Sequence, residues 1–486
     1  MNKISCFLPY AGKEQVEKTV NSLQATGLIE EIRLITTDAT LESLPDCEIL
    51  FVDMPYSSAT LKAIANAAKG EYTLLYTKET TLEMGMFALE RMIHILEDSS
   101  AGMVYADHYQ IADGKQSNAP VIDYQFGSLR DDFNFGSLLL FNTEKLKEAA
   151  GHMKSDYNFA GLYDLRLKLS QHSNLVHINE YLYSEVENDT RKSGEKIFDY
   201  VDPKNRDRQI EMEQACTEHL KEIGGYLAPE FKKIEFSAGN FEYEASVIIP
   251  VRNRIRTIRD AIKSVLMQKT DFKYNLIIID NHSTDGTTEA IDEFKDDERV
   301  IHIIPERTDL GIGGCCNMGV HHPKCGKFAV QLDSDDVYKD ENTLAIMVRA
   351  FYEQNCAMVV GTYMMTDFNM NMIAPGIIDH KEWTPANGRN NALRINGLGA
   401  PRAFYTPVLR EVKVPNTSYG EDYALGLNFS RQYQIGRVYD VVYLCRRWDD
   451  NSDASLDIVK MNGHNLYKDR IRTWELQARI AMNKKK

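Results

Sequence analysis

Three aspartates within four residues form the part of the sequence best suited to chemistry. The run Asp333-Ser334-Asp335-Asp336 directly follows residues 328–332, an apolar segment typical of a buried strand. Carboxylates this close together repel one another unless a cation or water separates them. Their oxygens are the ligands that Mg²⁺ and Mn²⁺ prefer, and either ion also neutralises a diphosphate. By itself, however, the run fits a solvated acidic turn just as well.

The elements around this run alternate between strand and helix. The apolar spacing predicts strands at 246–249, 276–279, 300–304 and 328–332, with helices at 258–268 and 287–294. Such alternation predicts a doubly wound α/β sheet, in which ligands lie at the carboxyl ends of the strands. Asp280 and Asp333 each come directly after a predicted strand. We therefore expect both side chains at the ligand-binding edge of the sheet.

The amino-terminal half repeats this plan in a diverged form. The matched segments are 4–9 with 246–250, 16–23 with 258–268, 32–35 with 276–279, 69–76 with 325–332, 101–105 with 357–361, and 163–169 with 421–427. We therefore expect two tandem copies of one fold. The predicted organisation is a first domain over 1–200, a helical linker over 201–243, a second domain over 244–455 and a helical extension over 456–486.

Composition limits the class of partner and the cellular location. The formal charge of −15 disfavours nucleic acid as a general partner, although a divalent cation would still allow a nucleotide to bind. The eight cysteines include no CxxC pair, which is typical of reduced thiols in the cytoplasm. There is no apolar run long enough to span a membrane, and the first residues do not resemble a signal peptide. The sequence thus predicts a soluble cytoplasmic protein.

The carboxyl-terminal residues leave room for peripheral contact with the inner membrane face. A helix is predicted over 468–486, with Ile471, Trp474, Ala478 and Ala481 on one face and Arg470, Arg472 and Arg479 around it. Such a helix either touches an anionic membrane where a lipid-linked acceptor waits, or packs on the domain.

Five ordered motifs of the second half resemble those of the family-2 glycosyltransferases, which have the GT-A fold. The resemblance covers residues 246–451. Its motifs are Val247-Ile248-Ile249-Pro250-Val251-Arg252-Asn253, Asp280-Asn281-His282-Ser283-Thr284-Asp285-Gly286, the stretch 311–319 with Asn317, Leu332-Asp333-Ser334-Asp335-Asp336, and Gly420-Glu421-Asp422-Tyr423. Each motif is weak alone, whereas five in order are specific. The resemblance implies an α/β protein of two tandem GT-A (nucleotide-diphospho-sugar transferase, Rossmann-like) domains.

The resemblance also implies how the donor is held. Asp335 and Asp333 would bind the Mn²⁺ or Mg²⁺ that bridges the donor's phosphates, and Asp333 would also face the ribose or sugar. Asp280 and Asn281 would lie beside the base. Asn281 stands where many members have Asp, so a UDP-sugar and a GDP-sugar both remain open. The other implied donor-binding residues are Pro250, Val251, Asn253, Asn317 and Ser334.

Asp422 is the implied general base of an inverting transfer. A carboxylate there would take the proton of the acceptor hydroxyl as that oxygen attacks the anomeric carbon. Glu421 would orient the acceptor or tune the pKa of Asp422. Without the other motifs, Gly420-Glu421-Asp422-Tyr423 is simply a helix start with acidic residues at the positive end of the dipole.

Two regions depart from the family or carry weaker signals. Trp448 stands where relatives carry a His that can bind metal, so His464 or Asp450 would have to supply that ligand. Arg447, or its neighbour Arg446, is a candidate partner for the donor's diphosphate. Trp383, in the long loop 375–407, is the candidate for stacking against the acceptor sugar.

The first half lacks a comparable acidic run. Its version reads Thr77-Lys78-Glu79-Thr80, in which Glu79 matches Asp335 and Lys78 adds a positive charge. Asp164 is retained where Asp422 lies. The favoured interpretation is a degenerate copy that serves in packing, acceptor placement or partner binding. A second transferase that works without a metal is the alternative.

The sequence therefore predicts a metal-assisted, inverting glycosyltransferase with its catalytic site in the second domain. It would move a hexose or N-acetylhexosamine from a nucleotide-diphosphate donor to a saccharide or lipid-linked acceptor in polysaccharide synthesis. The number of subunits is open, a homo-oligomer included. Two rivals remain: a non-catalytic protein that binds sugar or nucleotide, and a sugar nucleotidyltransferase. The residues 250–253 do not form the Gly-rich, basic triphosphate loop expected of the latter.

Overall fold

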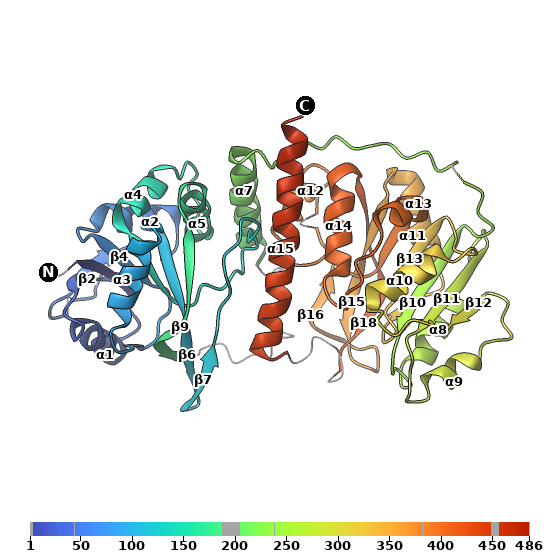
Figure 1. Ribbon diagram of the computed structural model, residues 1–486, viewed down its shortest axis with the longest axis horizontal. Coiled ribbons are helices and arrows are strands. Elements are labelled where there is room, and N and C mark those ends of the chain that lie inside the picture. The colour runs from blue at the N-terminus through green and yellow to red at the C-terminus, as the bar shows by residue number, and fades with distance from the viewer. Residues whose placement is uncertain are drawn as a thin grey trace. The chain divides into compact units, whose positions relative to one another are not determined.

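Two compact units make up the chain (Figure 1). The structure, a computed structural model, describes residues 3–42, 44–186, 205–237, 239–381, 383–448 and 456–485. Of these, residues 3–186, 206–224 and 456–473 belong to the first unit, and residues 205, 225–448 and 474–485 belong to the second.

The first unit is built on a nine-stranded mixed sheet. Its strands are β1 (Ile4–Pro9), β2 (Ile29–Thr36), β3 (Glu48–Phe51), β4 (Tyr72–Tyr76), β5 (Leu82–Met84), β6 (Met103–Ala112), β7 (Lys115–Ala119), β8 (Leu138–Asn142) and β9 (Leu175–Val186). The order is β3-β2-β1-β4-β8-β6-β9-β5, with β7 paired to β6. Strands β1 to β4 are parallel, and β8 runs antiparallel to β4.

Helices cover both faces of this sheet. The helices α1 (Lys13–Gln24) and α3 (Ala88–Asp98) pack on one face, while α2 (Ser58–Ala67), α4 (Thr143–Gly151) and α5 (Gly161–His172) pack together on the other. Side chains of β4 alternate between the two cores, with Leu74 in the first and Leu75 in the second, as expected of a strand buried on both faces. The helix α7 (Arg206–Glu222) packs against α5.

The second unit has a sheet with the same plan. Its strands are β10 (Ala245–Val251), β11 (Tyr274–Asp280), β12 (Val300–Ile303), β13 (Phe328–Gln331), β14 (Val337–Tyr338), β15 (Met358–Thr366), β16 (Met372–Ile378), β17 (Arg402–Tyr405) and β18 (Ile435–Arg446). The order is β12-β11-β10-β13-β17-β15-β18-β14, with β16 paired to β15. Each strand of the first sheet thus has a counterpart at the same place, which confirms the predicted pair of tandem α/β domains.

The helices of the second unit follow the predicted alternation. They are α8 (Ile258–Leu266), α9 (Thr287–Asp292), α10 (Ile312–His321), α11 (Thr343–Gln354), α12 (Gly388–Asn391), α13 (Thr406–Val412) and α14 (Glu421–Gln432). Residues 225–237 and 239–244 run along this unit without regular secondary structure. Leu227 and the side chain of Asn390 exchange two hydrogen bonds, and Ile234 does the same with Asn355. This segment is therefore held against the second unit.

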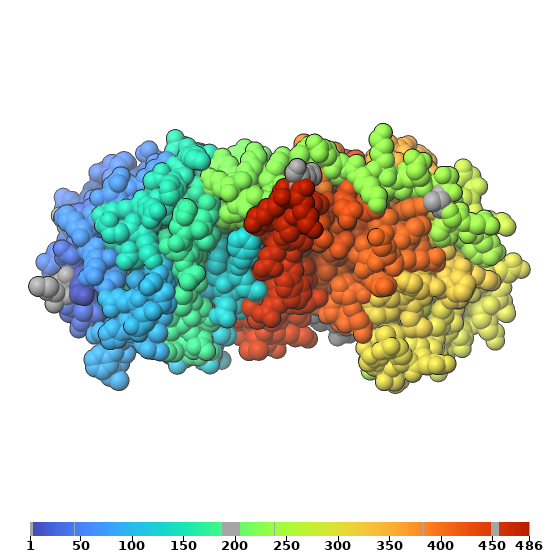
Figure 2. All heavy atoms as spheres, turned by 45° about the horizontal axis from the view of Figure 1, so that its top comes forward, coloured from blue at the N-terminus to red at the C-terminus, as the bar shows by residue number. Residues whose placement is uncertain are grey.

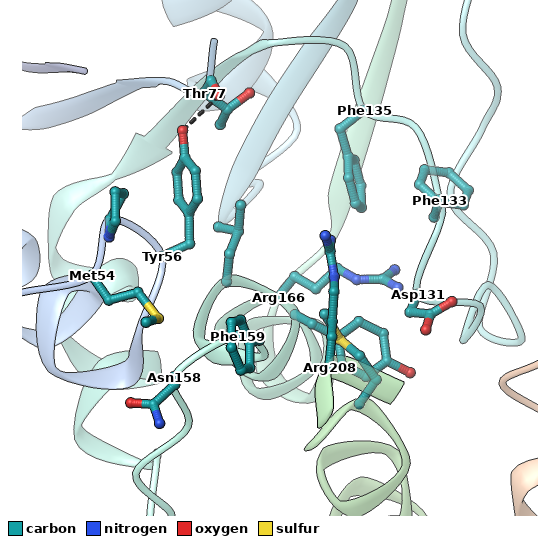
Figure 3. A pocket seen from close by; sticks show the side chains of 14 residues that line it. Met54, Tyr56, Thr77, Asp131, Phe133, Phe135, Asn158, Phe159, Arg166 and Arg208 are labelled. Carbon is teal, nitrogen blue, oxygen red and sulfur yellow. Dashed lines mark hydrogen bonds between the residues drawn. The ribbon is translucent and has the colours of Figure 1, made fainter. Parts of the chain in front are cut away.

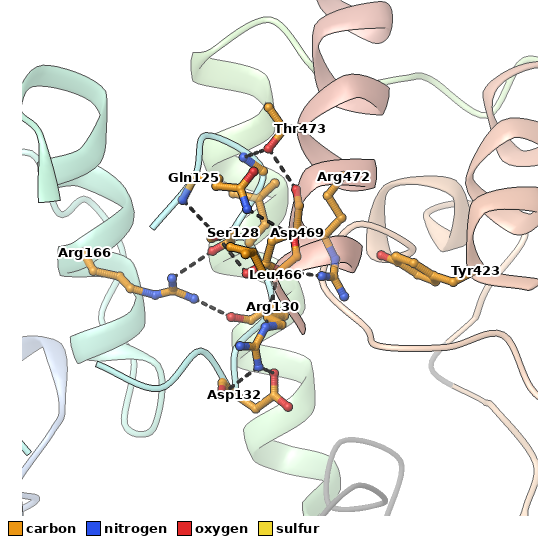
Figure 4. A network of polar contacts seen from close by, with 12 residues as sticks. Gln125, Ser128, Arg130, Asp132, Arg166, Tyr423, Leu466, Asp469, Arg472 and Thr473 are labelled. Atoms are coloured by element: carbon orange, nitrogen blue, oxygen red, sulfur yellow. Dashed lines mark hydrogen bonds and ion pairs between the residues drawn. The ribbon is translucent and has the colours of Figure 1, made fainter. Parts of the chain in front are cut away.

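The last helix, α15 (Ile458–Asn483), starts ten residues before the predicted position and contributes to both units. Within the first unit, Asp469 accepts a hydrogen bond from Ser128 at 2.9 Å and pairs with Arg130 at 3.4 Å (Figure 4). Within the second unit, Glu475 pairs with Arg431 of α14, and the two helices lie side by side (Figure 1). The last turns of α15 lie at the surface of the second unit (Figure 2).

The prediction that Trp474 belongs to an apolar face of this helix, with arginines around it, is wrong. Trp474 is 58% exposed, whereas Arg472 and Arg479 are fully buried. The two arginines tolerate burial because each pairs with an acid of the same helix at 2.7 Å, Arg472 with Asp469 and Arg479 with Glu475. They are therefore not placed to reach a membrane. Across the described part of the chain, no helix has the length and apolar character needed to cross a bilayer.

Candidate active site

The acidic run begins at the carboxyl end of the central strand β13. The amide of Asp333 donates to the Tyr443 hydroxyl of β18, and that hydroxyl donates to Asp333 Oδ2, each over 3.3 Å. The turn closes on itself because the amide of Asp336 donates to the carbonyl of Asp333. Thr257 secures the carbonyl of Ser334 at 2.9 Å, and the Ser334 side chain is buried. The run is thus a tied turn at the ligand-binding edge of the sheet.

Arg446, at the end of β18, holds this turn through hydrogen bonds. Its amide donates to Asp336 Oδ1 at 2.7 Å and its Nε donates to the Asp335 carbonyl at 2.6 Å. Its Nη1 pairs with Asp260 at 2.8 Å, and the side chain is fully buried. Arg446 is therefore committed to holding the turn and is not available to a diphosphate. Asp336 is buried as well, which raises its pKa well above the ordinary range.

Three further groups gather near Asp333 at the start of α14 and of β17. Arg402 Nη1 pairs with Asp422 Oδ2 at 2.9 Å, and Arg402 Nε donates to Gln331 at 3.1 Å. Burial opposes the charge of Arg402, but Asp422, Asp333 and Glu421 around it raise its pKa nevertheless. The structure therefore brings together Asp333, Asp422 and Glu421, as the sequence predicts, around an arginine that was not foreseen.

The carboxylates of this cluster carry more negative charge than Arg402 balances. Burial, and then repulsion from Asp335 and Asp422, raise the pKa of Asp333, although Arg402 opposes the shift. Burial and the neighbouring Asp422 raise the pKa of Glu421 to about 7, and its Oε2 is buried without a hydrogen-bond partner. Asp422 keeps 22% of its side chain exposed. Excess carboxylate charge at a strand end is the chemistry that a divalent cation would relieve.

The predicted base-side motif forms a closed loop. Asp280 is fully buried, and its two oxygens accept from the Ser283 amide and the Thr288 hydroxyl. Burial opposes its charge, but these bonds and that of His302 lower the pKa of Asp280. Asn281 donates to the carbonyl of Leu310 at 2.8 Å. Asp280 is therefore a support of the loop, not a group facing a ligand.

The opening loop joins the base-side loop directly. Asn253 is exposed at a φ of 54°, and its Oδ1 accepts from the Thr284 amide at 2.8 Å. Val251 is buried in β10, and its carbonyl accepts from the Asn281 amide. Pro250 is half-buried one residue earlier. These contacts fix the loop beside the ends of β10 and β11, where a nucleotide base is expected.

Arg254 connects the opening loop with the acidic run. Its Nε lies 3.7 Å from Asp335 Oδ2, and its guanidinium lies 5.9 Å from the ring centre of Trp448. Arg256 packs closer on the same ring, at 4.9 Å. Trp448 thus lies beside two arginines, one of which is the neighbour of Asp335. Arg447 is half-buried, and its amide donates to Thr366.

Two of the predicted residues, Asn317 and Trp383, make contacts other than the predicted ones, and two more cannot be assigned to the cluster. Asn317 exchanges hydrogen bonds with the backbone of Val414, so it braces the segment before α14. Trp383 is only 2% exposed and lies against Gly388, so it offers no face on which an acceptor sugar can stack. Asp450 falls outside the described residues, and His464 belongs to the part of α15 in the first unit.

Asp333 and Asp335 fit a divalent cation that is completed by phosphate oxygens and water, as Mg²⁺ sites often are. The described part of the chain contains no group of three His, Cys, Asp or Glu side chains arranged for a metal. A cation held by these two carboxylates would need further ligands from outside the protein.

Known proteins resemble this chain, and the match to a family model lies in the second unit. The model of the family described as Glycosyl transferase family 2 matches residues 246–403, which include Asp333, Asp335 and Arg402 but end before Asp422. An uncharacterized glycosyltransferase of Rickettsia felis is 37% identical over 198 residues, which are 40% of this chain and 31% of that protein. The GalNAc(5)-diNAcBac-PP-undecaprenol beta-1,3-glucosyltransferase of Campylobacter jejuni is 36% identical over 93 residues, 19% of this chain and 29% of that protein.

The chain thus spans less than a third of the length of either relative. Among solved structures, residues 1–349 of TarS of S. aureus in complex with UDP-GlcNAc are 18% identical, with a TM-score of 0.37, over 49% of this chain and 72% of that one. The family match, the strand order and the acidic cluster coincide in the same unit. Residues 246–403 of this unit are therefore similar to the glycosyl transferases of family 2.

Proposed function

We propose that the second unit is a metal-assisted, inverting glycosyltransferase. It would transfer a sugar from a UDP- or GDP-sugar to a saccharide or lipid-linked acceptor. The observation that carries the proposal is the cluster of Asp333, Glu421 and Asp422 around Arg402, with Asp335 beside Asp333, at the carboxyl end of the central strand. This is where ligands bind in sheets of this kind.

Each residue of the cluster has a separate task in such a transfer. Asp422 takes the proton of the acceptor hydroxyl. Arg402 holds the Asp422 side chain in place through Oδ2, so Oδ1 is the oxygen that contacts the acceptor. Glu421, with a pKa of about 7, holds a proton part of the time at neutral pH and then donates a hydrogen bond to the acceptor. The acceptor oxygen then attacks the anomeric carbon on the face opposite the diphosphate. The bond to the diphosphate breaks as the new bond forms, which inverts the anomeric centre.

Asp335 and Asp333 present the oxygens for a cation on the donor side. When bound there, Mn²⁺ or Mg²⁺ would neutralise the diphosphate and stabilise it as a leaving group. Arg254, within 3.7 Å of Asp335, is positioned to contact the same phosphates. Arg447 remains a candidate for that task, because its side chain is half-buried beside the turn.

The proposal is tested by incubating the protein with a panel of nucleotide sugars and measuring the hydrolysis of each, with Mn²⁺ and with a chelator. We expect one donor to be hydrolysed, and the chelator to remove that activity. At a limiting Mn²⁺ concentration the Asp335→Asn variant should lose most of it too, whereas Asp271→Asn should keep it because exposed Asp271 lies before β11, at the other end of the strands. Hydrolysis that continues at full rate in the chelator would refute the metal-assisted mechanism.

A further inference from the structure

The first unit contains a pocket of its own, with a volume of about 450 Å³. Tyr56 and Thr77, which line it, follow β3 and β4, and the Tyr56 hydroxyl donates to the Thr77 carbonyl at 2.6 Å. The pocket therefore opens at the carboxyl ends of parallel strands, where ligands bind in α/β sheets. Its volume falls within the range of about 300–1,000 Å³ that small-molecule sites occupy.

Five of its fourteen lining residues are aromatic. Phe133 and Phe135 are almost fully buried behind it, while Phe159 is 41% exposed at its rim. Rings that are held in place and partly exposed suit stacking against the apolar face of a sugar ring. Figure 3 shows these rings around one open space, with Asn158 at its edge as a polar group.

Two guanidinium groups and one carboxylate, that of Asp131, are the charged groups among the described lining residues. Arg166 is 5% exposed; it donates to the carbonyls of Ser128 and Arg130 and lies 4.7 Å from the ring centre of Tyr163. It therefore serves as a fixed wall. Arg208 is exposed, and in Figure 3 it rises from α7 toward the middle of the pocket. The net charge of the lining is positive in a chain whose formal charge is −15.

The wall that carries Arg208 is held firmly. Glu211, one turn further along α7, accepts from the amides of Asn158, Phe159 and Ala160 at 2.6–3.1 Å. These bonds fix α7 against the segment that contains Phe159. They also satisfy the amides of the three residues just before α5, so Arg208 is the exposed donor that a ligand's anion would meet.

We propose that this pocket binds a saccharide that carries one anionic group. The sugar ring would stack on Phe159, and the anion would pair with Arg208. A single exposed cation suits one carboxylate or phosphate better than a diphosphate. The site needs neither a nucleotide sugar nor a metal ion, so it stands independently of the transferase proposed for the second unit.

Calorimetric titration of the full chain tests the proposal with a uronic-acid disaccharide, a sugar 1-phosphate and a neutral disaccharide. We expect one anionic saccharide to bind more tightly than the neutral one, and the two anionic arms identify the anion as carboxylate or phosphate. Arg208→Ala should weaken that binding by about tenfold or more and leave the neutral sugar unchanged. Phe159→Ala should weaken both.

Matched controls separate the pocket from general effects on the unit. Lys221→Ala changes another exposed cation of α7, and Phe87→Ala removes a phenyl ring that is 69% exposed outside the pocket. Both should leave binding intact. The proposal is overturned if no anionic saccharide binds with a Kd below about 10 mM, or if binding is insensitive to Arg208 and Phe159. Tighter binding of a free nucleotide in the same pocket would overturn the assigned ligand class.

Discussion

The loops that follow β4 and β13 occupy the same place in two sheets of identical strand order, yet their charges differ. After β13, burial and the neighbouring carboxylate of Asp335 raise the pKa of Asp333. After β4, Lys78 pairs at 2.6 Å with Glu185, which is fully buried in β9. The loop after β4 therefore carries its own positive charge, whereas the loop after β13 has three aspartates and no basic residue of its own. The fold alone does not make a metal site.

The neighbours of the two loops show the same divergence on a shared frame. Tyr183 and Tyr443 are each the ninth residue of their strand. The hydroxyl of Tyr443 accepts from the Asp333 amide, and that of Tyr183 accepts from the Ser137 amide at 2.9 Å. His108 and Ser137 also donate to Glu185, so its carboxylate has no capacity left for a cation. A tyrosine at the same place in both units thus supports a different loop in each.

The two helices that begin beside these loops differ in the same sense. Asp422 in α14 is partly exposed and paired with Arg402. Asp164, at the matching place in α5, is fully buried, and both of its oxygens lack a hydrogen-bond partner. Asp164 is not among the residues that line the pocket of the first unit. Retention of the residue type has not retained the site, which disfavours a second transferase in the first unit.

The largest expected effect comes from replacing the two matched aspartates. Asp422→Asn should lower the turnover number by about 10²–10⁴-fold because the amide cannot accept the acceptor proton. Asp164→Asn should leave it unchanged. The measurement is steady-state transfer with the donor identified by the panel, together with donor affinity, which Asp422→Asn should preserve. Appreciable turnover by Asp422→Asn would show that another group is the base.

Replacing the acids of the two loops should have the next largest effect. Asp335→Asn should weaken the response to Mn²⁺ by roughly 10–100-fold, because one of two carboxylate ligands is lost. Glu79→Gln, at the matching position of the first loop, should not change the metal concentration that gives half-maximal activity. Glu79 is exposed, so the variant should fold normally. Equal effects of the two changes would mean that both loops bind metal.

Much of this contrast could be predicted from the sequence, because apolar runs and acidic residues are local signals. The strands 276–279 and 328–332 and the start of α14 come within a few residues of the observed elements. Arg402 could not be predicted. Its partners Gln331 and Asp422 lie 71 and 20 residues away, and an arginine at the start of a strand carries no signal of its own.

Burial was the property that local patterns predicted least well. Trp383 stands among polar residues and glycines, which is typical of an exposed loop, yet it is buried against Gly388. The arginines of α15 show the opposite error, because their acidic partners on the same helix make burial possible. In both cases the outcome depends on packing with residues that sequence spacing does not reveal.

Removing Lys78 should measure how strongly the first loop depends on its internal ion pair. Lys78→Met should cost about 2 kcal/mol at neutral pH, below the ~3–5 kcal/mol of a fully buried pair because Lys78 is about one third exposed. Burial alone would raise the pKa of Glu185, but its interactions with His108 and Lys78 outweigh burial and lower that pKa from 4.5 to about 2. The ion pair of ionised Glu185 therefore stabilises the fold fully above pH 4.5, and this stabilisation is lost as the pH falls toward 2.

Chemical denaturation followed by circular dichroism at several pH values checks this expectation. The gap between Lys78→Met and the parent should close as the pH falls through that interval. Lys18→Met, which removes an exposed ion pair with Glu14, should leave stability almost unchanged at any pH. A gap that is independent of pH would assign the loss to packing instead of charge.

The smallest expected effect has the opposite sign and concerns Asp164. Burial raises its pKa from 3.8 to about 6, although Lys168 opposes the shift. The folded chain therefore holds this proton more tightly than the unfolded chain, and stability falls as the pH rises from 3.8 through 6. Asp164→Asn removes that penalty and should stabilise the protein by about 1–2 kcal/mol at neutral pH, with no gain below 3.8. Asp422→Asn should give no such gain, because it deprives buried Arg402 of its ion-pair partner. If Asp164→Asn destabilises the chain at neutral pH, the carboxylate is needed where it lies, and the first unit has kept more of the shared site than its burial implies.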